Sequence, residues 1–199
     1  MRIAVDRNQT IGSHEKSNAG LHKQLENLGC ELSVMPLPFG DYCLITDEMQ
    51  DTINRRGDKL KKADLVGDIK ISCDRKNSIL ELAGNICGKS HARFRDEVIL
   101  ASKCGCKLYI VVEDDGGYVD RKKTIYNKPV RSIDDLFSWK NSRAFIWKAG
   151  KQLYPNATKG ATLAKACLTM KAKYGCEFVF CSSKDAGEMI LKLLSGEET

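Results

Sequence analysis

The first 113 residues alternate short apolar runs with helical patterns, and the run at 107–113 most constrains the fold. Its interior, Leu-Tyr-Ile-Val-Val, is continuously apolar, which is typical of a central strand covered on both faces. Leucines spaced by four and three within 18–28 predict a helix that packs through one face. Strands that alternate with helices in this way predict an α/β domain.

Further elements follow from the same patterns. The expected strands are 2–6, 30–36, 41–46, 67–76, 107–113 and 176–181, and the expected helices are 18–28, 78–87, 91–103, 132–153, 162–174 and 183–194. Residues 47–66 are charged and irregular, which indicates an exposed excursion. A break at 114–117 suggests a core over 1–113, a linker over 114–131, and a C-terminal α/β extension over 132–199 that packs on the core or completes it.

Composition excludes several classes of protein. A hydrophobic fraction of 42% and a charged fraction of 29% are globular values, so disorder, collagen and coiled-coil rods are excluded. Charged residues interrupt every apolar run before it reaches 18 residues, so no membrane span is expected. The chain opens on a strand pattern and not on a secretory apolar segment. We therefore expect a cytoplasmic protein without a membrane partner.

Nine cysteines are present, an odd number, and no two of them form a Cys-x-x-Cys motif. A disulfide scaffold is not expected in a chain of this size without a signal peptide. Buried reduced thiols that pack as small hydrophobes are the main interpretation. A zinc site at Cys104 and Cys106, in a zinc-binding regulatory protein, is the alternative, and it needs two further ligands.

The chemistry is concentrated at the end of the strand expected at 67–76. Side chains alternate along a strand, so Asp74 and Lys76 share one face. Asp41 begins the preceding strand just after a turn, and it converges on Asp74 if the two strands pair. Two carboxylates about 4 Å apart repel by roughly 4 kcal/mol at an effective dielectric near 20. A proton, or a hard cation such as Mg²⁺ or Mn²⁺, would offset that repulsion.

These residues carry a resemblance to a known family. The segment 37–42 (Leu-Pro-Phe-Gly-Asp-Tyr), followed by Asp74-Arg75-Lys76, resembles the nuclease domain of the XPF-type structure-specific endonucleases. That family belongs to the restriction-endonuclease-like PD-(D/E)xK superfamily. The likeness extends to Val5-Asp6, to Arg93-Phe94-x-x-Glu97 and to the strand at 108–113, and residues 160–181 resemble the ending of compact bacterial and phage members. It implies a mixed β-sheet flanked by helices, with a helical C-terminal extension.

The sequence departs from the family pattern in three places. The family pattern is Gly-Asp, a gap, Glu-Arg-Lys, three residues and Asp. Asp74 stands where Glu is usual, and the closing Asp falls on Leu80, with Glu81 one place later. The first-strand signature Asp-x-Arg-Glu ends here on Gln9 in place of Glu. The central trio of Asp41, Asp74 and Lys76 is present.

The resemblance implies a metal-dependent DNA endonuclease that hydrolyses phosphodiester bonds, at branched or otherwise structured DNA. Asp41 and Asp74 would hold Mg²⁺ or Mn²⁺, and Lys76 would position the attacking water or neutralise charge on the phosphate. The alternative is a catalytically inactive nuclease-like module for DNA binding or dimerisation.

Four further residues are supporting candidates, each with a structural alternative. Asp6 is a possible third acid at a strand end, and Arg75 either clamps a nearby acid or reaches a phosphate. Glu81 forms a capping-box pattern with the serine three residues before it. Glu97 lies four residues after an arginine, a spacing typical of a helical ion pair.

DNA is the expected partner, and a homodimer formed through the helices of 132–199 is possible. The candidate phosphate contacts are Arg55, Arg56, Lys59, Lys61, Lys62 and Arg93. A second basic cluster lies at 121–123, although such clusters are usually solvated faces. No aromatic residues interleave with these clusters in the manner of a single-strand stacking platform. Trp139 and Trp147 are eight apart on the expected helix 132–153, so we expect both in the core or at an interface.

Overall fold

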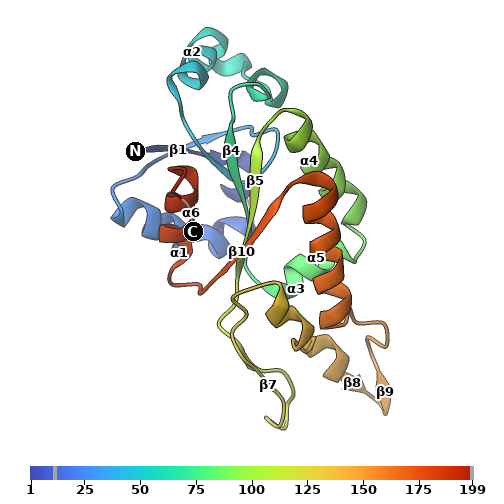
Figure 1. Ribbon diagram of the computed structural model, residues 1–199. Coiled ribbons are helices and arrows are strands. Elements are labelled where there is room, and N and C mark those ends of the chain that lie inside the picture. Colours follow the sequence, from blue (N-terminus) through green and yellow to red (C-terminus); the bar gives the residue numbers. More distant parts are fainter. Residues whose placement is uncertain (11–12, 198–199) are drawn as a thin grey trace.

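A six-stranded sheet in the order β10-β5-β4-β3-β1-β2 runs through the middle of the protein (Figure 1). The structure is a computed structural model that describes residues 1–10 and 13–197. The strands are β1 (Arg2–Asp6), β2 (Glu31–Met35), β3 (Tyr42–Leu44), β4 (Ile71–Lys76), β5 (Lys107–Glu113) and β10 (Glu177–Cys181). Strand β3 is antiparallel to both of its neighbours, and the other pairs are parallel. The predicted mixed α/β fold is confirmed.

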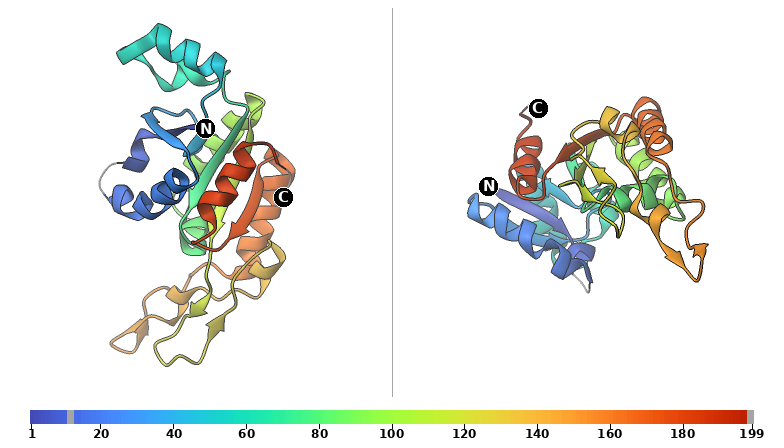
Figure 2. Two further views of the ribbon diagram at one scale, coloured as in Figure 1. Left: turned by 90° about the vertical axis from the view of Figure 1, so that its left-hand side faces the viewer. Right: turned by 90° about the horizontal axis from the view of Figure 1, so that it is seen from below.

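Helices cover both faces of the sheet (Figure 2). Helices α1 (Ser13–Asn27) and α6 (Ala186–Leu194) pack on one face, and α3 (Ile79–Ile86), α4 (His91–Lys103) and α5 (Gly160–Tyr174) pack on the other. Alternate residues of β5 enter the two buried clusters that result. The strand is therefore covered on both faces, as its continuous apolar run predicts.

The C-terminal segment contributes to the same sheet. Strand β10 pairs in parallel with β5, α5 packs against α3 and α4, and α6 packs against α1. The division of the chain at residues 113 and 131 stays a prediction, and residues 198–199 of the expected extension lie outside the described residues.

The helix expected at 132–153 is wrong. In its place stand two short 3-10 helices, η4 (Asp134–Phe137) and η5 (Ser142–Phe145), and a hairpin of β8 (Trp147–Lys148) and β9 (Lys151–Gln152). The Asn141 side chain accepts a hydrogen bond from the backbone N–H of Arg143, which favours a turn over a continuing helix. Ala149 and Gly150 both have positive φ, so they form a two-residue turn that reverses the chain.

The excursion at 47–66 is more ordered than its charge pattern indicates. It begins with α2 (Asp47–Arg56), whose N-cap Thr46 accepts a hydrogen bond from the backbone N–H of Met49. The Met49 side chain is fully buried, so this helix has an apolar anchor that the charge pattern conceals. Two 3-10 helices, η2 (Gly57–Lys59) and η3 (Lys62–Leu65), complete the segment.

A second hairpin, β6 (Gly117–Tyr118) with β7 (Tyr126–Asn127), lies inside the expected linker. Both hairpins extend beyond the C-terminal end of β5 (Figures 1 and 2). Among the described helices, none has the length and hydrophobicity required to cross a membrane.

All nine cysteines are free thiols, and most of them are buried. Within residues 1–10 and 13–197, no group of three or more His, Cys, Asp or Glu side chains is arranged to hold a metal ion. The two cysteines proposed for zinc, Cys104 and Cys106, lie within the turn between α4 and β5.

Candidate active site

A polar cleft of about 1220 Å³ opens where β1 and β4 end and β3 begins. Asp41, Asp74 and Lys76 all line it. Both faces of the sheet are covered, so the residues Asp74 and Lys76 are only 3% and 6% exposed. Their side chains lie on the face covered by α3, α4 and α5. The trio identified in the sequence is therefore brought together in a largely dehydrated setting.

The backbone of Asp41 is held between two strands. Its N–H donates to the carbonyl of Cys73 on β4 at 2.8 Å, and its carbonyl accepts the N–H of Asp6 at the end of β1, also at 2.8 Å. Gly40, just before it, has φ +67°, a conformation that favours glycine. These contacts fix where the Asp41 side chain enters the cleft.

The turn that precedes Asp41 is anchored by side chains from two other elements. The Gly40 N–H donates to Oε1 of Glu97 on α4 at 2.9 Å. Ser72 on β4 donates from its hydroxyl to the carbonyls of Phe39 and Tyr42, at 3.2 and 3.1 Å. Glu97 therefore supports the turn directly. Burial, followed by the negative charge of nearby Asp74, raises the pKa of Glu97.

The carboxyl group of Asp41 is surrounded by neutral donors and a second acid. Its Oδ1 accepts from the Gln9 amide at 2.5 Å, and its Oδ2 accepts from the backbone N–H of Arg75 at 2.8 Å. Burial raises the pKa of Asp41 well above its usual range, and the charge of Asp74 raises it further. This pair of acids thus favours a bound proton or cation.

Lys76 is paired with Asp74. Its Nζ lies 2.6 Å from Asp74 Oδ1 and 5.3 Å from the centre of the Phe94 ring. Burial alone would lower the pKa of Lys76, but the attraction of Asp74 and then of Asp41 outweighs it, so the pKa lies above its ordinary value. The ammonium group is therefore charged at neutral pH.

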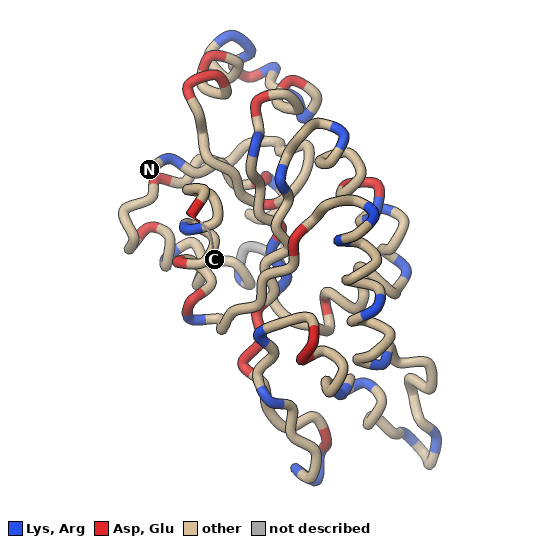
Figure 3. Tube along the Cα trace, in the orientation of Figure 1, with Lys and Arg blue, Asp and Glu red and all other residues tan. Residues whose placement is uncertain are grey.

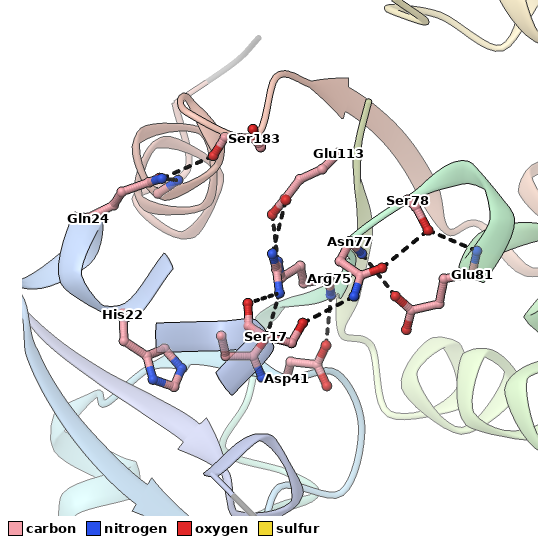
Figure 4. A network of polar contacts seen from close by, with 12 residues as sticks. Ser17, His22, Gln24, Asp41, Arg75, Asn77, Ser78, Glu81, Glu113 and Ser183 are labelled. Atoms are coloured by element: carbon pink, nitrogen blue, oxygen red, sulfur yellow. Dashed lines mark hydrogen bonds and ion pairs between the residues drawn. The ribbon is translucent and has the colours of Figure 1, made fainter. Parts of the chain in front are cut away.

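Arg75 points to the opposite face of the sheet from Asp74 and Lys76. Its guanidinium makes two hydrogen bonds to Glu113 on β5, at 2.6 and 2.9 Å (Figure 4). It makes another to Oδ1 of Asn18 on α1 at 2.5 Å. Of the two interpretations of Arg75, the geometry favours the structural clamp, which joins β4, β5 and α1.

Glu81 and Asp6 both line the cleft and both have structural partners. Glu81 accepts the backbone N–H of Asn77 at 2.9 Å, and its own N–H donates to Ser78 Oγ at 3.2 Å, which is the capping arrangement at the start of α3 (Figure 4). Asp6 accepts the backbone N–H of Leu37 at 3.0 Å.

Comparison with known proteins identifies the family. A model of the ERCC4 domain matches residues 8–193, which is nearly the whole chain. The chain belongs to the ERCC4 domain family. The resemblance to XPF-type nuclease domains, inferred from the motifs around Asp41 and Asp74, is thereby confirmed. The search of curated proteins gave no match.

Two solved structures share the fold of this ERCC4 domain. One is XPF from Aeropyrum pernix, with a TM-score of 0.52 and 15% identity. The other is XPF from Aeropyrum pernix in complex with DNA, with a TM-score of 0.51 and 17% identity. Each comparison covers 98% of this chain and 63% of the XPF chain, so this chain spans less than two thirds of those proteins.

The basic residues predicted to contact DNA divide into two groups in the ERCC4 domain. Lys62 and Arg93 line the cleft, and Lys62 Nζ lies 3.5 Å from Asp6 Oδ1. The others are exposed on and after α2, outside the cleft lining: Arg55, Arg56, Lys59 and Lys61. Their role in DNA binding stays a prediction. Arg93 and Glu97 do not form an ion pair among the described contacts, so Glu97 is free to hold Gly40.

Sequence reasoning missed three residues of the site. Gln9 looked like a departure from the family signature, yet its amide holds Asp41. Asn18 bonds both Gln9 and Arg75, and only its place near the start of a helix hinted at a role. Arg143 lines the cleft from η5, and no signal could have located it because a helix was expected there.

Proposed function

We propose that this ERCC4 domain is a metal-dependent DNA endonuclease that hydrolyses phosphodiester bonds at branched or otherwise structured DNA. The observation that carries the proposal is the convergence of Asp41, Asp74 and Lys76 in one polar cleft. Family membership supports a nuclease. The solved complex of XPF with DNA supports DNA as the partner.

The donor set suits Mg²⁺ or Mn²⁺. Magnesium commonly binds through one or two carboxylates, retains several waters and takes substrate phosphates as further ligands. Asp41 and Asp74 would supply the two carboxylates. Burial, followed by the charge of Asp74, raises the pKa of Asp41, so its ionised form is disfavoured unless a cation offsets the charge. When bound, such a cation lowers the pKa of a coordinated water and stabilises charge on the departing oxygen.

The protein's own groups have separate roles. Lys76 remains protonated, so it orients the attacking water or stabilises negative charge on the scissile phosphate. Gln9 and the backbone N–H of Arg75 hold both oxygens of Asp41 in a fixed orientation. Lys62 and Arg93 place further positive charge in the cleft, where phosphates would lie.

Cleavage by purified variants tests the proposal. We expect Asp74→Asn and Lys76→Met each to lower cleavage of a Mg²⁺-supplemented panel of flap, branched and linear DNA by at least about 100-fold. DNA affinity in EDTA, measured by fluorescence anisotropy, should change little. Asp96→Asn, at an exposed acid beside Glu97 on α4, is the matched control and should cleave normally.

Unchanged cleavage by Asp74→Asn would refute the catalytic assignment. If no DNA in the panel is cut while binding persists, the alternative of an inactive DNA-binding or dimerisation module is supported. A homodimer, a cytoplasmic location and a role in DNA repair or recombination belong to the same proposal, and dimerisation is tested by analytical ultracentrifugation.

A further inference from the structure

Residues 140–159, which contain η5 and the β8–β9 hairpin, form a surface that we call the hairpin arm. It contains five basic and no acidic residues, so its formal charge is +5. All five basic side chains are exposed: Lys140, Arg143, Lys148, Lys151 and Lys159. In Figure 3 the hairpin at the lower right shows basic positions without acidic ones. Because no acidic residue of the segment offsets these charges, the surface attracts a polyanion such as a nucleic acid.

The hairpin arm also presents aromatic rings to solvent. Trp147 is 59% exposed and Tyr154 is 44% exposed. The Arg143 guanidinium lies 5.8 Å from the centre of the Tyr154 ring, so basic and aromatic groups interleave. Exposed rings among basic groups are typical of surfaces that bind single-stranded nucleic acid by base stacking.

One expectation from the sequence is corrected here. Trp139 and Trp147 do not share a helix face, since Trp139 is 6% exposed in the core and Trp147 lies on β8. The hairpin arm lies outside the basic clusters considered in the sequence, and its aromatic and basic residues come together where the chain folds back at Ala149 and Gly150.

Internal hydrogen bonds hold the hairpin arm in its shape. Gln152 donates from its amide to the carbonyl of Ala144 at 2.6 Å, and the Leu153 N–H donates to the carbonyl of Ile146 at 2.9 Å. These bonds tie the hairpin to η5. A preformed surface loses little conformational entropy on binding, which favours stacking by rigid aromatic rings.

The hairpin arm is continuous with the active-site cleft, because Arg143 belongs to both. We propose that it binds an unpaired DNA strand that leaves the cleft, with Trp147 and Tyr154 stacking on bases and Lys148 and Lys151 contacting phosphates. Bases within a duplex already stack on one another, so exposed rings select unpaired bases over double-stranded DNA. The inference rests on the proposed function, since this strand is part of the nuclease substrate.

Tryptophan fluorescence tests the stacking directly. The chain has two tryptophans, so Trp139→Phe leaves Trp147 as the sole tryptophan. In EDTA, where metal-dependent cleavage is blocked, a single-stranded oligothymidine should quench Trp147 emission, and a duplex of equal length should quench it less. Absence of quenching by the single strand at concentrations that saturate binding would overturn the inference.

Affinity measurements on the full chain give a second test that does not depend on Trp139→Phe folding normally. Trp147→Ala and Tyr154→Ala should each weaken binding of the single strand by at least about fivefold. That is the smallest effect expected when one base–aromatic stack is lost. Lys148→Ala with Lys151→Ala should reduce the salt slope of binding by about 1.4, from about 0.7 for each phosphate contact.

The matched control is Lys103→Ala with Lys173→Ala. These exposed lysines lie at the ends of α4 and α5, which lead into β5 and β10. They are therefore near the starts of these strands, at the opposite end of the sheet from the hairpin arm. The control should leave both affinity and salt slope unchanged. Equal effects from the hairpin-arm and control pairs would refute a specific strand contact.

The outcomes separate this inference from the proposed function. Unchanged strand affinity in Trp147→Ala, together with cleavage that is lost in Asp74→Asn, would overturn the inference alone and leave the surface to a protein partner. Trp147 quenching by the single strand, together with failure to cleave any DNA in the panel, would support the strand contact and refute the nuclease.

Discussion

Replacing Gly40 by alanine tests how the turn before β3 sets the position of Asp41. A Cβ at Gly40 would lie 2.1 Å from Ser72 Oγ and 3.2 Å from the Cys73 carbonyl oxygen. The hydroxyl of Ser72 cannot move without cost, because it donates to the carbonyls of Phe39 and Tyr42. Alanine at this position is therefore opposed both by the positive φ and by a fixed neighbour.

The expected loss of stability follows from these two terms. A left-handed conformation costs a non-glycine residue about 1–2 kcal/mol. Overpacking against a fixed core atom adds about 1–3 kcal/mol. We therefore expect Gly40→Ala to lower the free energy of unfolding by about 2–5 kcal/mol. Gly105→Ala is the matched control, because Gly105 has φ +69° and no atom within 4 Å of an added Cβ, so only the first term applies.

Urea unfolding followed by circular dichroism measures both values. The Ser72→Ala background isolates the clash, because it removes the closest atom. In that background the cost of Gly40→Ala should approach that of Gly105→Ala. Equal costs for Gly40→Ala and Gly105→Ala in the otherwise unaltered chain would refute the steric argument, since only the surroundings of the two glycines differ.

Two further predictions concern buried groups. Arg75→Met leaves the Glu113 carboxylate buried without its cation, so it should lower the free energy of unfolding, measured in urea, by about 3–5 kcal/mol. The control, Arg95→Met, removes an exposed ion pair and should lower it by less than about 1 kcal/mol. Similar losses in both variants would contradict this prediction. Burial raises the pKa of Cys43 and of Cys106 from 9.0 to about 12, so the folded state holds these two protons more tightly than the unfolded state does. The free energy of unfolding that these thiols contribute is fully present below pH 9.0 and should fall as the pH rises toward 12. Urea unfolding at pH 8 to 11 measures the fall, which should be smaller in Cys43→Ala with Cys106→Ala, and a flat profile would contradict the prediction.

The sheet could be predicted from the sequence because its signals are local. The continuous apolar run of β5 predicts a strand covered on both faces, and alternate residues of β5 do lie in the two buried clusters. Of the three leucines whose spacing predicts a packed helix face, Leu21 and Leu25 on α1 are buried. The third, Leu28, follows the end of α1 and is exposed, so that part of the prediction is wrong. Each of these signals depends on neighbours within about seven residues, which the sequence displays directly.

Residues 132–153 could not be predicted because their conformation depends on contacts between distant parts of the segment. The spacing of apolar residues there resembles a helix, yet the Asn141 side chain caps a turn and Gln152 bonds back to Ala144. Arg143 consequently reaches the cleft from a place that no helical pattern would give it. The hairpin arm is thus visible only once the chain has folded back on itself.

Charge pairing bears on the cation that we propose at Asp41. Arg75 is neutralised by Glu113 on one face of the sheet, and Lys76 is paired with Asp74 on the other. Among the described residues Asp41 has no ion pair of its own. The uncharged Gln9 amide and a backbone N–H donate to its carboxyl group, and the neighbouring acid Asp74 contacts it. A glutamate in place of Gln9 would add a further negative charge there without supplying a proton donor. The amide at Gln9 therefore holds Asp41 in place and leaves its charge for the proposed divalent cation to offset.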